Sequence, residues 1–150
     1  MTTYERLLSE LSEGLGIDVA PDSDGIAELV ADGHIVLLRP DATGEREILA
    51  FATVASAPEG GFPAETLRRA LELNLFGRDV VGHHLGYFAG SLLLSANLPI
   101  EGLTAENLAD RILVLARLAG TLSDRLSATD AAPAAGDAPT ALSGEGFMAV

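Results

Sequence analysis

The stretch Glu45–Pro58, EREILAFATVASAP, decides the fold, because as a β-strand it is apolar on both faces. Side chains of a strand alternate between its two faces. One face carries Ile48, Ala50, Ala52 and Val54, and the other carries Leu49, Phe51 and Ala55. A strand of a soluble antiparallel sheet normally has one polar face. This strand therefore needs a cover on each side, supplied by the rest of the chain, a second copy of it, or a foreign segment.

Length and composition indicate one domain without covalent or metal cross-links. The chain has 150 residues and no cysteine, which excludes a disulfide framework and a catalytic thiol and is compatible with a reducing compartment. The N-terminus lacks the basic and apolar pattern of a signal peptide. No apolar stretch approaches the roughly 20 residues that span a bilayer. We expect a cytoplasmic protein.

The charge of the chain constrains its partners. A net charge of −13 and a pI near 4.4 make nucleic acids and anionic membranes poor partners. A basic or amphipathic polypeptide fits this surface better. The alternative is that the acidity only keeps a chain of mean hydropathy +0.30 in solution.

Periodicity and turn residues predict an α+β fold. Thr2 and Glu5 have the spacing of a capping box before a helical leucine pattern. Asp32-Gly33 is a two-residue hairpin signal. We expect an antiparallel sheet of about five strands with three helices, in the order α-β-β-β-α-β-β-α. The helices cover residues 3–15, 63–76 and a segment beginning at Thr104, and the strands cover residues 26–31, 34–39, 45–58, 84–89 and 91–97.

The C-terminal segment differs in composition from the rest. Residues 128–150 are mainly Ala, Pro, Gly, Ser, Thr and Asp, which bury too little apolar area to offset the entropy lost on ordering. We therefore expect a domain over residues 1–127 and a flexible tail over residues 128–150.

Five local patterns carry a family resemblance. They are Leu11-Ser-Glu-Gly-Leu-Gly-Ile17, the turn Asp22–Gly25, the Leu-x-x-Ala-Leu-x-x-Asn segment Leu67–Asn74, the Gly-Tyr-Phe segment Gly86–Phe88, and Leu98–Leu108 at the start of the last helix. With the element order, they resemble the class I type III secretion chaperones of the Tir-chaperone type over about residues 3–127. The resemblance implies a homodimeric cytoplasmic chaperone, part of a virulence system, that keeps the N-terminal segment of a secreted effector extended and export-competent without ATP.

A peptide-binding surface is predicted on the sheet independently of that resemblance. An extended peptide can add to a sheet edge through backbone hydrogen bonds while alternate side chains enter apolar pockets. The candidate partner-binding residues are Leu29, Ile35, Leu37, Leu49 and Phe51. The alternative is that these side chains are ordinary core beneath the first and last helices.

The middle helix predicts a dimer, because its apolar residues exceed what one sheet face can cover. Two-fold packing of identical surfaces would bury the excess. The candidate interface residues are Leu67, Leu71, Leu75, Leu85 and Tyr87. The alternative is that the other two helices cover this surface within a monomer.

No pattern predicts catalysis, a metal site or a cofactor. His83 and His84 are adjacent, so on a strand they point to opposite faces. Asp22-x-Asp24-Gly25 opens like a calcium loop but lacks its remaining ligands. Glu45 and Glu47 are expected to be solvated. A different class of function, a small regulatory module of similar topology that engages a folded partner, remains the alternative, and an unrecognised enzyme comes third.

Overall fold

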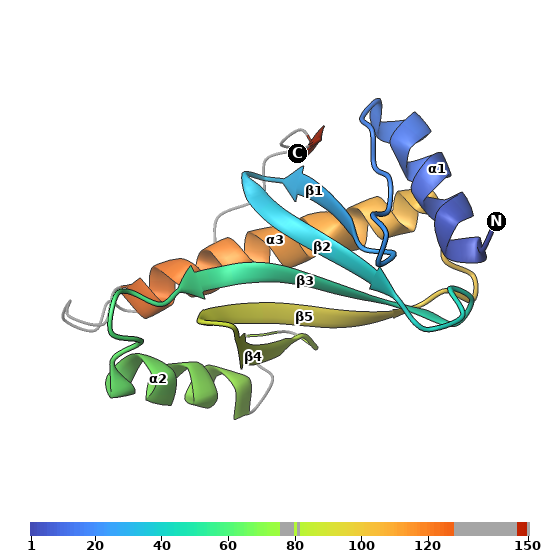
Figure 1. The fold of residues 1–150 in the computed structure, drawn as a ribbon. Coiled ribbons are helices and arrows are strands. Elements are labelled where there is room, and N and C mark those ends of the chain that lie inside the picture. The colour runs from blue at the N-terminus through green and yellow to red at the C-terminus, as the bar shows by residue number, and fades with distance from the viewer. Residues whose placement is uncertain (76–79, 81, 128–146, 150) are drawn as a thin grey trace.

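The structure, a computed structural model, describes residues 1–75, 80, 82–127 and 147–149. In this part of the chain it contains three α-helices and one six-stranded antiparallel sheet (Figure 1). The elements are α1 (Thr3–Leu15), β1 (Ala27–Ala31), β2 (His34–Pro40), β3 (Glu47–Ser56), α2 (Ala64–Leu75), β4 (His84–Phe88), β5 (Ser91–Pro99), α3 (Ala105–Ser127) and β6 (Phe147–Ala149). The predicted α+β class and the order of its first eight elements are confirmed.

The strands lie in the order β4-β5-β3-β2-β1-β6, so the long strand β3 is central. β1 and β2 form the hairpin that Asp32-Gly33 predicted, with φ of 49° at Asp32 and 77° at Gly33. Positive φ at both central residues is the geometry of a type I′ turn. Arg117 of α3 lies 3.8 Å from the Asp32 carboxylate and ties this turn to the helix.

One face of the sheet is covered by α3, with α1 packed beside it. Alternate residues of β1, β2, β3 and β5 are buried on that face, and the largest fully buried side chains come from both layers. They are Tyr4, Leu7, Leu8, Leu11, Leu29, Leu38, Ile48, Leu94, Leu108, Ile112, Leu115 and Leu122. The helices thus cover one apolar face of β3, and no described helix covers the other.

The N-terminus of α1 is fixed by side chains from two segments. The predicted capping box is present, since the Thr2 hydroxyl accepts from the Glu5 N–H and the Glu5 carboxylate accepts from the Thr2 N–H. The Glu45 carboxylate accepts from the Thr3 hydroxyl and, at 3.0 Å, from the Thr3 N–H. These bonds lower the pKa of Glu45. Glu45 is exposed, as expected, and its carboxylate also meets the positive end of the helix dipole.

α2 joins the sheet at its β4 edge through one amide side chain. Asn74 accepts from the Leu85 N–H at 3.0 Å and donates to the Leu85 carbonyl at 3.2 Å, as a neighbouring strand would. Only Ala70 of α2 is buried. Within one protomer α2 therefore meets the rest of the fold only along a narrow strip, and most of its apolar residues stay exposed or half-buried.

The sixth strand, β6, was not predicted. Its three residues pair antiparallel with β1, within the segment expected to be a flexible tail. For residues 128–146 and 150, which lie outside the described residues, that expectation stays a prediction.

Candidate protein-binding site

The sheet face opposite α3 carries four of the predicted partner-binding residues. Ile35 and Leu37 come from β2, and Leu49 and Phe51 come from β3. They alternate with core residues, so their side chains point away from the helices. Ile35 is 49% exposed and the other three are half-buried. The alternative that they are core beneath the helices is therefore wrong for these four.

Strand register brings this set together. Leu37 lies directly opposite Phe51, and Phe51 lies opposite Ser95 of β5. Directly opposed side chains in an antiparallel pair have Cβ atoms about 4.5–5.5 Å apart. The face is therefore apolar across β2 and β3, and β5 adds Leu93 together with the polar residues Ser95 and Asn97.

A shallow cavity of about 320 Å³ opens on this face. Its wall is mostly apolar, with one cationic side chain, Arg39, at the β2 side. The lining residues are Arg39, Leu49, Phe51, Gly86, Tyr87, Phe88, Leu93 and Ser95. Its size lies at the lower end of the roughly 300–1,000 Å³ of small-molecule sites, and it is open to solvent along the sheet. It suits apolar side chains of an extended segment lying across the strands.

Leu29 does not belong to this surface, and its prediction as a partner-binding residue is wrong. Its side chain has no exposed area and lies in the core. The physical reason is the hairpin register, which pairs Leu29 with the core residue Val36. The β1 residues on the open face are Glu28, which pairs with Leu37, and Val30, which pairs with Ile35.

Five of the eight residues that line the cavity were not predicted as site residues: Arg39, Gly86, Phe88, Leu93 and Ser95. Arg39 lies two residues after Leu37 on β2, and Leu93 of β5 pairs with both Thr53 and Gly86. Alternation along residues 91–97 would have placed Leu93 on one face, but the pairing of β5 with β3 was needed to say which face. Phe88, which is 73% exposed, was noted only as part of a family-like pattern.

The predicted dimer residues form a second surface, which we call the leucine stripe: Leu67, Leu71 and Leu75 of α2. They are 36%, 71% and 70% exposed, respectively. Helical spacing of four residues places them on one side of α2. The alternative that the other helices cover them within a monomer is wrong, because α2 contacts α3 only weakly and the three leucine side chains stay exposed.

The two predicted interface residues on β4 differ from each other. Tyr87 is 60% exposed, and its ring packs edge-on against Phe62 with centroids 6.1 Å apart. Leu85 is partly buried against the core. Tyr87 can therefore extend the leucine stripe, whereas Leu85 mainly anchors β4.

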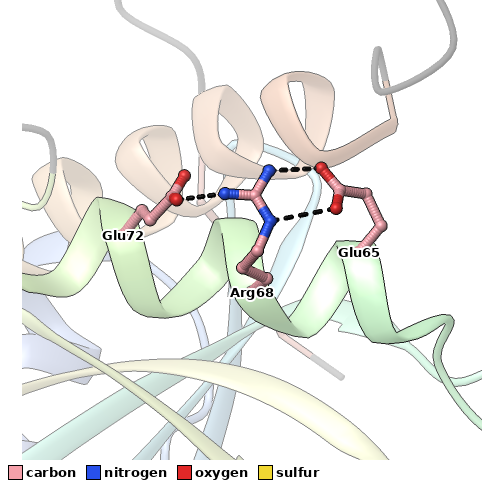
Figure 2. Close-up of polar contacts among 3 residues, drawn as sticks. All are labelled: Glu65, Arg68 and Glu72. Atoms are coloured by element: carbon pink, nitrogen blue, oxygen red, sulfur yellow. Dashed lines mark hydrogen bonds and ion pairs between the residues drawn. The ribbon is translucent and has the colours of Figure 1, made fainter.

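Three charged side chains of α2 form a row of ion pairs, the Glu65–Arg68–Glu72 ladder (Figure 2). Arg68 donates to the carboxylates of both Glu65 and Glu72, one turn away on either side. These contacts raise the pKa of Arg68, and they lower the pKa of Glu65. All three side chains are more than half exposed, so their ion pairs contribute little to the free energy of folding. The ladder forms a polar border beside the apolar stripe, as the rim of a protein interface does.

The described residues do not group three His, Cys, Asp or Glu side chains in a way that could hold a metal ion. The His83 ring nitrogen Nδ1 lies 2.9 Å from the Val80 carbonyl, which gives that ring a structural contact. Within the same described ranges, every helix is too short or too polar to cross a membrane.

Comparison with known families gives one match. The model of the Tir chaperone protein (CesT) family matches residues 6–123. None of the curated proteins matches the sequence.

Solved structures of similar fold include a secretion chaperone bound to a protein fragment and two other protein complexes. The Yersinia pestis type III secretion chaperone SycH, solved with a stable fragment of YscM2, is 26% identical, with a TM-score of 0.59 over 79% of this chain and 98% of that one. In the ExsC–ExsE complex the matched chain is 21% identical, with a TM-score of 0.68 over 84% and 97%. In the heterodimeric ExoU–SpcU complex of Pseudomonas aeruginosa it is 19% identical, with a TM-score of 0.57 over 79% and 95%.

Proposed function

Because this chain belongs to the Tir chaperone protein (CesT) family, we propose that it is a type III secretion chaperone that binds the N-terminal segment of a secreted effector. It keeps that segment extended and export-competent in the cytoplasm, without ATP. Its similarity to a type III secretion chaperone solved with a bound protein fragment supports this function. It acts by binding and performs no catalysis.

The open apolar sheet face is the observation that carries this proposal. Three strands present Ile35, Leu37, Leu49, Phe51 and Leu93 on a side that no described helix covers. An extended segment crossing this face can place alternate apolar side chains into the cavity beside Phe51 while its polar side chains face water. Such binding requires alternating apolar and polar side chains in the segment and not one particular sequence, which suits a chaperone.

We further propose that the chain is a homodimer joined through the leucine stripe and Tyr87. Isolated monomers rarely expose leucines to this extent on one side of a helix. Two-fold packing sets the stripe of one protomer against that of its partner and leaves the Glu65–Arg68–Glu72 ladder at the rim. Because Tyr87 also lines the cavity, the binding face and the dimer contact are continuous.

The test uses amide exchange of a candidate effector bound to this protein. Protection confined to the effector's N-terminal segment, in an extended pattern, is expected. Protection over a patch that is discontinuous in sequence would instead indicate a folded partner and contradict the chaperone assignment.

Substitutions locate the binding face. Phe51→Asp and, separately, Ile35→Asp are expected to abolish effector binding while the far-UV spectrum stays unchanged, because a charge would have to be desolvated under the bound segment. Val114→Asp, on an apolar α3 residue that is 47% exposed, is the matched control and should bind normally. Wild-type affinity in both sheet variants would contradict the site.

A further inference from the structure

The two outer edges of the sheet are occupied in different ways. At the β4 edge, the Asn74 amide bonds both the N–H and the carbonyl of Leu85, and α2 lies alongside. At the opposite edge, β1 is paired with β6, so Leu29, Val30 and Ala31 lie opposite Ala149, Met148 and Phe147. Figure 1 shows β6 as a short strand beside β1, distant in sequence from the rest of the sheet.

The β1 edge continues the open face on which the proposed client lies. Val30 of β1 pairs with Ile35 of β2, and Ile35 is the most exposed of the predicted partner-binding residues. A strand added to β1 would therefore extend the same apolar surface sideways. When no strand pairs with it, such an edge offers unpaired backbone N–H and C=O groups to any extended segment that reaches it.

We propose that β6 is an intramolecular occupant of this strand-addition site, and that an extended client segment pairs with β1 only after displacing it. That the competing segment belongs to a client rests on the proposed function, whereas the pairing of β6 with β1 does not depend on that function. The occupant is the chain's own C-terminal sequence Phe147-Met-Ala149, an apolar run that follows a segment rich in Ala, Pro and Gly.

The short backbone pairing between β6 and β1 means that another extended segment can displace β6. Only three residues of β6 pair with β1, whereas β1 and β2 pair over five. Attachment to the same chain nevertheless gives β6 an effective concentration that a free peptide must exceed. If the edge is closed about nine-tenths of the time, the apparent affinity of a competing segment falls about tenfold.

Backbone substitution in the full-length chain tests the occupancy. Phe147→Pro combined with Met148→Pro removes two N–H groups and fixes φ, so β6 cannot pair. We expect amide exchange in residues 29–31 to rise at least tenfold at the amides directed toward β6, while the alternate amides, directed toward β2, stay protected. Ala141→Pro, which lies outside β6, is the matched control and should exchange like wild type.

A peptide added in trans provides the second readout. The probe is a synthetic Gly144–Val150 segment, GEGFMAV. It should bind the double-proline variant and protect the same β1 amides, and it should bind wild type about tenfold more weakly because the edge is already filled. Equal exchange of residues 29–31 in wild type and variant, or equal peptide affinity for both, would overturn the proposal.

The outcomes separate this inference from the proposed function. Neither readout contains an effector, so a failure to bind effectors would leave the exchange result standing. Conversely, an unoccupied β1 edge would leave the open-face binding of an effector unaffected.

Discussion

Leu71→Asp should convert the proposed dimer into a monomer without unfolding the chain. Leu71 is 71% exposed, so little of its side chain supports the fold of one protomer. Full burial of a leucine contributes about 1.5–3 kcal/mol, and the exposed share of Leu71 corresponds to about 1–2 kcal/mol. A two-fold interface contains the residue twice, which brings the loss to about 2–4 kcal/mol per dimer.

That loss corresponds to a dissociation constant raised about 30-fold to 1,000-fold. Burying the aspartate carboxylate in the interface adds a desolvation cost, so this increase in the dissociation constant is a lower bound. Sedimentation equilibrium from nanomolar to micromolar protein measures the effect, with a monomer mass of 15.5 kDa as the reference. Far-UV circular dichroism and the thermal midpoint should stay within error of wild type.

Val114→Asp is the matched control for this experiment, because it places the same charge on an exposed apolar position of another helix. It should leave the dissociation constant unchanged. A Leu71→Asp variant that dimerises as tightly as wild type, or a wild type that sediments as a monomer at micromolar concentration, would contradict the proposed dimer interface.

Three further substitutions probe the fold. Asn74→Ala leaves the N–H and carbonyl of Leu85 without their partner and should lower the free energy of unfolding by about 1–3 kcal/mol, measured by urea denaturation. Gly33→Ala forces a Cβ into φ of 77° and should cost about 1–2 kcal/mol in the same assay. Glu45 has a lowered pKa in the folded state, so its contribution is present above its ordinary value of 4.5 and is lost as pH falls below it. Glu45→Gln should flatten the decline of the urea midpoint below about pH 5; an unchanged slope would show that the Thr3 contact does not matter.

The sequence predicted the elements because each rests on local chemistry. The capping box, the Asp32-Gly33 turn and the two apolar faces of β3 all involve residues close together in the chain. The leucine stripe was likewise visible as helical spacing. The wrong assignment of Leu29 to the binding surface was avoidable from the sequence. A two-residue hairpin pairs Leu29 with Val36 and so places both side chains on the same face of the sheet.

The tertiary structure decided what depends on contacts between distant segments. It placed both covering helices on one side of the sheet and so made Ile48 core while Phe51 stayed at the open face. It brought Glu45 to the start of α1, Asn74 to the edge of β4, and β6 to the edge of β1. The sequence by itself determined that β3 needs two covers, because side-chain alternation is local. Which face remains open for a partner was set only by the packing of α3 against the sheet, because that choice depends on which distant apolar surface is buried there.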